Sequence, residues 1–196
     1  MPGLMHPSLD AAKPEARVGE QLLARVLAPY KPHCRYLQTA TVEYPRPSQS
    51  IATASGRFVI PDSCYIASTG HFNAVEFNIC YNQLTYCLLA RCIEDNALEC
   101  FEGWTPEDFT RRQLSDFLIA RFSSAFHKPL TGRTFDGRVE VVKVAFRREA
   151  TFMRTICRFE DDHGGGADGG ATIAIINSGG HHIDQRPFTG SANHEH

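Results

Sequence analysis

The chain has 196 residues, of which 42% are hydrophobic and 21% charged, and its formal net charge at pH 7 is −2. This is the composition of an ordinary one-domain globular protein, and the near-neutral charge gives no reason to expect nucleic-acid binding. No segment approaches the roughly 20 apolar residues of a membrane helix, so we expect no membrane association. The first 17 residues contain three prolines and no apolar core, unlike a signal peptide, which favours a cytoplasmic protein.

Seven cysteines are present, an odd number, and none belongs to a CxxC pair. Several lie in or near an apolar helix, where free cysteine behaves as a small buried hydrophobe, so we expect inert reduced thiols rather than disulfides. The histidines of the polar C-terminal segment lack the spacing of a transition-metal site. We therefore expect neither a metal nor another cofactor.

The predicted elements of the first half begin after a leader, 1–16, that we expect to be disordered. Apolar residues recur at helical spacing up to Pro29, which ends the first helix, and a proline-rich turn separates two strands. The predicted helices cover 18–28 and 71–92, and the predicted strands cover 34–44 and 51–60.

The second half is predicted to be mostly strand. Thr105, Pro106 and Asp108 form a helix start with a cap, a proline at the first position and an acid three residues after the cap. That helix is expected to end near residue 117, and the glycine-rich stretch 161–170 is interpreted as a hairpin loop. The predicted strands cover 118–127, 137–147, 150–160 and 171–177.

The order of these elements predicts the fold class. A helix as apolar as 71–92 must be covered on most sides, and an antiparallel sheet wrapped around it provides that cover. We therefore predict an α+β hot-dog fold, with one domain over 17–177 and a flexible tail over 178–196. Such sheets leave edges and apolar faces that usually pair, so we expect a homodimer or a higher homo-oligomer.

The long helix places amides on two neighbouring stripes. The first stripe comprises Val75, Ile79, Asn82 and Tyr86, and the second comprises Asn73, Glu76, Cys80, Gln83 and Cys87. An unsatisfied amide among apolar neighbours would cost about 1–3 kcal/mol. Asn82 is therefore either paired with backbone groups at a packing contact or directed at a ligand.

Gly70, His71 and Phe72 stand where this helix is predicted to begin. A helix N-terminus offers unpaired N–H groups and a positive dipole end, which can hold a thioester carbonyl oxygen as it becomes negative. Histidine can move protons near neutral pH, and Gly70 would allow a tight turn beside a ligand. The plainer interpretation is a capping or surface histidine.

The sequence around these residues resembles known enzymes. Gly-His-Phe leading into a central helix resembles the hot-dog dehydratases of fatty-acid synthesis. The block DSCYIASTGHFNAVEFNICYNQLTY, with LLARVLAPY before it and FSSAFHKPL after it, resembles the FcoT-type thioesterase family of actinobacteria over about residues 20–177. This resemblance implies pocket roles for Tyr65, Asn73, Asn82 and Tyr30.

The resemblance implies two chemistries. Some members of the family are described as long-chain fatty acyl-CoA thioesterases. Relatives in isonitrile-lipopeptide and β-amino-acid biosynthesis add glycine to the β-carbon of a 2-enoyl chain held on an acyl carrier protein, and thioester release can follow. The partners implied for this chain are thus glycine and an acyl carrier protein.

The residues at the helix start favour addition over hydrolysis. Hydrolysis needs a positioned water, yet Asn73 is a poor base and Glu76, one turn into the helix, is the nearest carboxylate. Addition needs an amine deprotonated and a proton delivered to the α-carbon, which suits His71 with Glu76 as its partner. Acyl-CoA hydrolysis is the alternative, and a non-catalytic acyl-binding protein is the third possibility.

Glycine also needs a partner for its carboxylate. The strand predicted over 118–127 and the residue that follows it supply Arg121, Ser124, His127 and Lys128 as candidates. Strand alternation puts Arg121 with His127 on one face and Ser124 with Lys128 on the other, and the sequence does not decide which face looks inward. The plainer interpretation of both cations is a solvated surface charge.

Overall fold

The computed structural model of the chain describes residues 13–45, 50–67, 71–131, 133–148 and 150–176. The helices are α1 (Glu20–Leu27), α2 (Ala74–Glu94) and α3 (Pro106–Arg112), with short 3₁₀ turns η1 (Pro32–Cys34) and η2 (Glu99–Phe101). The strands are β1 (Lys13–Arg17), β2 (Leu37–Tyr44), β3 (Ala52–Val59), β4 (Phe117–Lys128), β5 (Thr134–Phe146), β6 (Ala150–Glu160) and β7 (Gly166–Ile176). None of the helices in these ranges has the length and apolarity needed to cross a bilayer.

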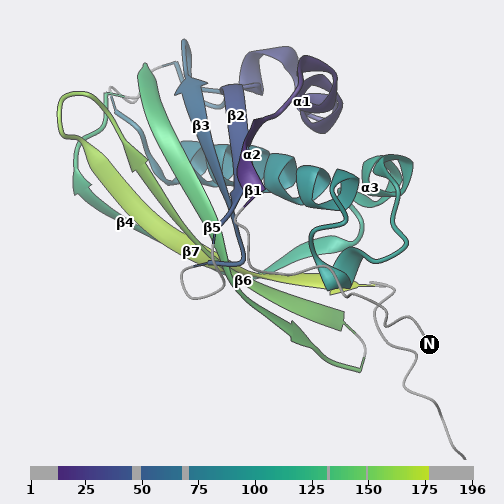
Figure 1. Cartoon of the computed structure of the whole chain (residues 1–196). Coiled ribbons are helices and arrows are strands. Elements are labelled where there is room, and N and C mark those ends of the chain that lie inside the picture. The colour runs from purple at the N-terminus through teal and green to yellow at the C-terminus, as the bar shows by residue number, and fades with distance from the viewer. Residues whose placement is uncertain (1–12, 46–49, 68–70, 132, 149, 177–196) are drawn as a thin grey trace, which may run out of the picture.

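The strands of the described chain form one antiparallel sheet in the order β1-β2-β3-β5-β6-β7-β4. β3 and β4 are consecutive in the chain but lie on opposite sides of β5, β6 and β7, because α2 lies between them in sequence. Figure 1 shows the sheet curving across α2, with α1 and α3 beside the helix. The predicted α+β hot-dog fold is therefore confirmed.

The core lies between α2 and the concave face of the sheet. Side chains of β6 alternate strictly between buried and exposed, as expected for a strand with one covered face. Phe77 of α2 packs against Phe159 and Phe122, with ring centroids 4.9 and 5.8 Å apart. The Tyr81 hydroxyl lies 2.6 Å from the Thr155 hydroxyl of β6. These contacts fix which side of α2 faces the sheet.

α2 begins three residues later than predicted. Asn73 is the N-cap: its side chain accepts hydrogen bonds from the Val75 and Glu76 N–H groups, and Glu76 returns a bond to the Asn73 N–H. His71 and Phe72 therefore precede the helix. The Phe72 N–H donates to the Leu130 carbonyl (3.0 Å), which joins this segment to the residues after β4.

Two other boundaries differ from the prediction. β1 lies partly within 1–16, the segment expected to be a leader, while residues 1–12 fall outside the described ranges. The stretch 161–170 was predicted to be a loop, but β7 begins at Gly166 and runs through its glycines. A Cβ on Gly170 would lie 2.5 Å from the Thr155 carbonyl oxygen, so close strand packing explains that glycine better than loop flexibility does.

Candidate active site

A cleft of about 610 Å³ opens where α2 begins and β4 ends. The segment before α2 forms one wall and the end of β4 forms the other. Its lining residues are His71, Phe72, Asn73, Ala74, Phe126, His127, Lys128 and Pro129. The cleft therefore contains the predicted His71, Asn73 and Lys128. Gly70, the predicted turn residue beside them, lies outside the described residues.

Backbone N–H groups in the first turn of α2 already donate hydrogen bonds to the helix cap. The Asn73 amide oxygen accepts from Val75 (2.9 Å) and Glu76 (3.4 Å), and the Glu76 carboxylate accepts from the backbone (3.2 Å) and the amide (3.0 Å) of Asn73. Ala74, the first residue of the helix, lines the cleft. The positive end of the α2 dipole therefore lies at the cleft.

Glu76 is buried and tied into the helix cap. Its side chain is 3% exposed, and its carboxylate receives both bonds from Asn73. Asn73 and Glu76 therefore stabilise the start of α2 at the predicted site. It also leaves the Glu76 carboxylate poorly placed to take a proton from a water in the cleft.

Sequence reasoning missed Tyr36, a buried tyrosine near Glu76. Its hydroxyl has no hydrogen-bond partner among the described residues, although the Cys64 thiol lies beside it. Burial chiefly raises the pKa of Tyr36, and Cys64, Cys34 and Glu76 raise it further, so the phenol stays protonated. Nothing in the sequence pattern distinguishes it from an ordinary core aromatic residue.

The first stripe of α2 is half exposed rather than buried. Val75 is 42% exposed, and Asn82 is half buried, donating to the Asn78 side chain (2.9 Å). The buried amide is instead Gln83, on the second stripe. It accepts from the Tyr36 and Leu37 N–H groups (3.0 Å each) and donates to the Cys34 carbonyl (2.6 Å). Asn82 is therefore available to a ligand in a way that Gln83 is not.

The two predicted pocket tyrosines lie in different surroundings. Tyr30 packs beside α2, where burial chiefly raises its pKa and the nearby Tyr86, Cys87 and Cys80 raise it further. Tyr65 is 53% exposed in the loop that follows β3. The structure therefore places Tyr30 along the helix and Tyr65 at the surface.

β4 directs its two faces differently. Phe122 and Phe126 pack against Phe77, with ring centroids 5.8 Å away in each case, so their face looks toward α2. Ser124 shares this face and is half buried. Arg121 is exposed on the opposite face, so the structure brings Ser124 toward the helix and keeps Arg121 away from the cleft.

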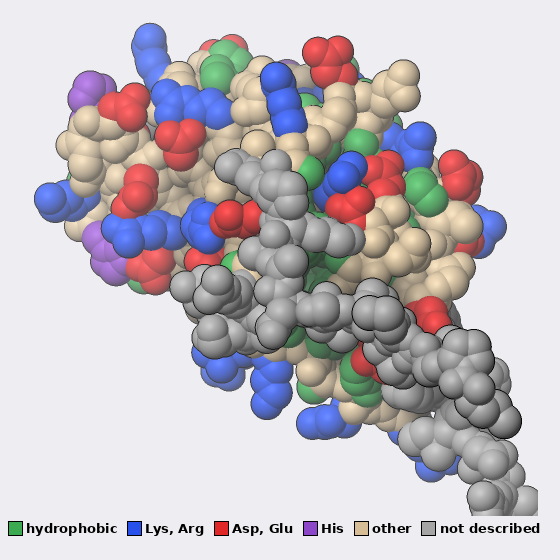
Figure 2. Space-filling model, viewed as in Figure 1, with side chains coloured by type: hydrophobic (Ala, Val, Ile, Leu, Met, Phe, Trp, Pro, Cys, Tyr) green, Lys and Arg blue, Asp and Glu red, His purple; other side chains and the backbone are tan. Residues whose placement is uncertain are grey.

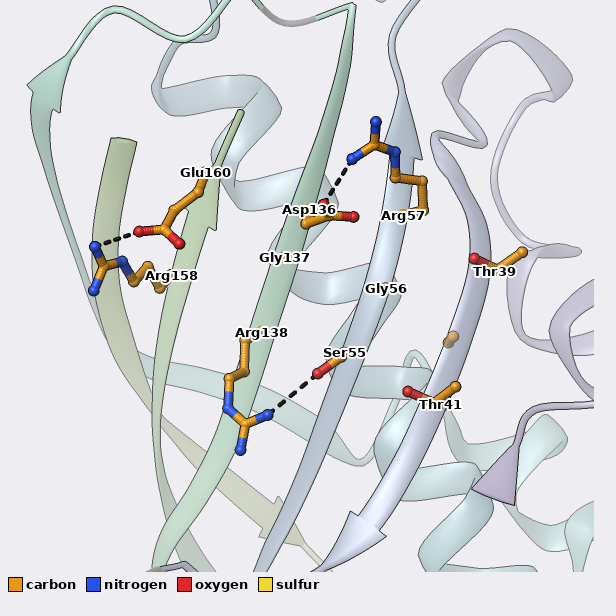
Figure 3. A pocket seen from close by; sticks show the side chains of 11 residues that line it. Thr39, Thr41, Ser55, Gly56, Arg57, Asp136, Gly137, Arg138, Arg158 and Glu160 are labelled. Carbon is orange, nitrogen blue, oxygen red and sulfur yellow. Dashed lines mark hydrogen bonds and ion pairs between the residues drawn. The ribbon is translucent and has the colours of Figure 1, made fainter. Parts of the chain in front are cut away.

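A second hollow, of about 330 Å³, lies on the outer face of the sheet (Figure 3). It contains no predicted site residue. Each of its arginines has a carboxylate partner: Arg57 contacts Asp136 (2.6 Å), Arg138 contacts Glu43 (2.9 Å) and Arg158 contacts Glu160. Both charge types also intermingle over this face in Figure 2. The hollow is therefore a surface of ion pairs within and between strands, and each arginine that lines it already has a carboxylate partner.

All seven cysteines are free thiols, and most of them are buried. Burial raises the pKa of Cys87 and Cys100 to about 12 each, which keeps both protonated at neutral pH. No group of three His, Cys, Asp or Glu side chains within the described ranges could hold a metal ion. The side chains that line the cleft include two imidazoles, an amine and an amide.

Comparison with known proteins places these features in a family. Residues 25–175 match the model of the FcoT-like thioesterase domain. The chain belongs to the FcoT-like thioesterase family. A (2E)-enoyl-[ACP] glycyltransferase from Streptomyces coeruleorubidus is 45% identical over 163 residues, covering 81% of this chain and 97% of the relative.

The chain is also similar to a mycobacterial protein and to a solved structure. A protein of the same name from Mycobacterium tuberculosis H37Rv is 39% identical over 168 residues, covering 82% of this chain and 88% of the relative. Among solved structures, a mutant thioesterase from Pseudomonas aeruginosa has 10% identity and a TM-score of 0.40, covering 69% of this chain and 81% of that one.

Proposed function

We propose that this FcoT-like protein adds glycine to the β-carbon of a 2-enoyl thioester carried on an acyl carrier protein, with formation of a C–N bond. The supporting observation is the 45% identity to a (2E)-enoyl-[ACP] glycyltransferase over 97% of that relative. The cleft agrees with this chemistry, because Glu76 is tied into the helix cap while His71 lines the opening. The product would enter isonitrile-lipopeptide or β-amino-acid biosynthesis.

The first catalytic group is the positive end of α2. The thioester carbonyl oxygen would accept a hydrogen bond from the Ala74 N–H. As the glycine nitrogen attacks the β-carbon, the electrons of the C=C bond move toward that oxygen, and the donor and helix dipole stabilise the growing charge. His71 would then give a proton to the α-carbon. Asn73 would act by holding Glu76 and the first turn in place.

Side chains around the cleft would bind the two substrates. Lys128 lines the cleft and would pair with the glycine carboxylate, with the Ser124 hydroxyl as a second partner. The acyl chain would follow the half-exposed stripe of α2 past Asn82 and Tyr30, with Tyr65 at the entrance. Arg121 is left out of this proposal because it projects from the opposite face of β4.

We also propose a homodimer in the cytoplasm. β4 is an edge strand, and apolar surface is exposed at Phe126 (44%) on this strand and at Val75 (42%) near the start of α2. A second copy would cover both features, as exposed edges and apolar patches generally require. Seven free thiols agree with a reducing compartment.

The deciding experiment incubates the protein with glycine and a 2-enoyl thioester of an acyl carrier protein. Intact-mass spectrometry should show the carrier with the mass of one glycine added. Appearance of free acid and unloaded carrier alone would disprove addition. A saturated acyl-CoA tested without glycine distinguishes the hydrolase, which the family model's name makes the second candidate. Binding without turnover in both assays would indicate an acyl-binding protein.

A further inference from the structure

Glycine addition requires a proton to leave the nitrogen and a proton to reach the α-carbon. Glycine carries an ammonium group at neutral pH, so one proton must leave before the lone pair can attack. His71 is suited to the second transfer, and Glu76 was the predicted partner for the first. The Glu76 carboxylate, however, is 3% exposed and already accepts two hydrogen bonds from Asn73. Both bonds fall on Oε2 and hold the carboxylate in the helix cap, so the candidates for the first transfer are the other titratable side chains that line the cleft, His127 and Lys128.

The end of β4 offers such a group. His127 lines the same cleft as His71, on the opposite wall. Its Nε2 contacts the Oδ1 of Asp168 on β7, and both side chains are more than half exposed. A carboxylate bound to one imidazole nitrogen fixes the ring and leaves the other nitrogen, Nδ1, free to exchange a proton.

The strand itself is irregular at this residue. The pairing of β4 with β7 shifts register between Phe126 and Lys128, so His127 falls at the irregular position. Bulges of this kind redirect a side chain and are common beside active sites. Asp168 faces Ala125 in the same ladder and so lies on the face of the sheet opposite to Phe126. His127 contacts it there, and it lines a second hollow together with Asp168 as well as the cleft.

We propose that His127, oriented by Asp168, is the base that takes the proton from the glycine ammonium group; this inference rests on the proposed glycine addition. With Nε2–H donating to Asp168, the Nδ1 lone pair accepts the proton. The nitrogen then forms its bond to the β-carbon while the C=C bond breaks, and His71 protonates the α-carbon. The product is a secondary ammonium, so one proton has moved from nitrogen to carbon. Solvent then resets both imidazoles.

The test is the rate of glycine adduct formation by His127→Ala, measured on the full chain by intact mass. General-base catalysis typically contributes about 10²–10⁴-fold, so kcat should fall by roughly 100-fold or more while the KM for the enoyl carrier changes little. Added imidazole should restore part of the rate, which a purely structural role would not allow. A kcat within about twofold of the wild type, or a loss that imidazole does not relieve, would overturn the proposal.

A second set of variants tests whether Asp168 acts through His127. If it acts through His127, the rate should fall in Asp168→Asn but fall no further when that change is added to His127→Ala, because residues that act as a unit are not additive. Independent, multiplying losses would contradict this role. His163→Ala is the matched control: it is an exposed histidine in the turn between β6 and β7, outside the cleft, and its rate should equal the wild type.

The wild-type reaction separates this inference from the proposed function. If the wild type forms the adduct and the His127 variants keep their rate, only the role of His127 is wrong. If the wild type releases free acid without forming the adduct, the proposed function is wrong and the role of His127 fails with it.

Discussion

At the scale of single residues, the buried polar groups of α2 are divided between structure and chemistry. Gln83 makes three hydrogen bonds to the segment before and at the start of β2, while Asn82, the adjacent residue, stays half exposed. The two amides differ by one position on the helix, which is a rotation of about 100°. One position therefore separates a structural amide from a candidate ligand contact.

Replacing Gln83 should destabilise the protein. Gln83→Leu would leave the Tyr36 and Leu37 N–H groups without their acceptor, at a cost of roughly 1–3 kcal/mol for each group left unpaired. Urea unfolding followed by circular dichroism would measure the loss. Gln38→Leu, at an exposed position of β2, is the matched control and should change stability little. Equal stability of the two variants would contradict the assigned role.

At the scale of elements, α2 is held against the sheet by a cluster of phenylalanines. Phe77 is fully buried and contacts rings on β4 and β6 as well as Phe72 just before the helix. The cluster therefore connects the helix to both the edge and the centre of the sheet. It also sets the position of the α2 start relative to the end of β4, which are the two walls of the cleft.

Truncating Phe77 should weaken both the fold and the cleft. Phe77→Ala removes a fully buried ring, which typically costs about 3–5 kcal/mol. Thermal and urea unfolding would measure this loss. Phe152→Ala, at an outward position of β6 that is 36% exposed, is the comparison and should cost much less. A similar loss in both variants would mean that the cluster is not the main link between α2 and the sheet.

At the scale of the whole molecule, two features matter: the apolar surface that a single chain leaves uncovered, and the thiols that its interior buries. The edge strand β4 and the half-exposed stripe of α2 lie uncovered in the single chain, which supports pairing with a second copy. The interior contains several thiols whose burial opposes ionisation. The first feature predicts that two copies associate, and the second predicts that the fold loses stability at alkaline pH.

The dimer can be tested by placing a charge on the stripe. The wild type should sediment at twice its chain mass of 21.8 kDa, and Val75→Glu should shift it toward that single mass. Leu114→Glu, at a residue that is 65% exposed after α3, should leave the dimer intact. Sedimentation equilibrium measures all three proteins. A monomeric wild type would refute the proposed dimer.

Alkaline pH should destabilise the fold. Burial raises the pKa of Cys87, Cys100 and Cys157 from an ordinary 9.0 to about 12, so these thiols stay neutral in the folded state. Above pH 9 they ionise after unfolding, so the free energy of unfolding should fall as the pH rises from 9 toward 12. Unfolding curves across this range would show the slope, and Cys87→Ala should reduce it. An unchanged slope in that variant would contradict the explanation.

Much of this protein follows from local sequence pattern. Helical periodicity and capping residues predicted α1, α2 and α3, and strand patterns predicted every strand except β1, because these signals act over a few neighbouring residues. The ends of elements were predicted less well where a residue type is common in two kinds of structure, as glycine is in loops and in closely packed strands. The glycines of β7 read as a loop, although close strand packing is what requires them.

The sequence by itself determined the elements other than β1, their hot-dog order, the choice of His71 and Lys128 as site residues, and the spacing of Asn73 and Glu76 that forms the helix cap. Only the tertiary structure decided that Arg121 faces away and that His127 meets Asp168 on the neighbouring strand. The physical reason is distance along the chain. His127 and Asp168 are 41 residues apart, and no local pattern specifies which long-range contacts a curved sheet will make.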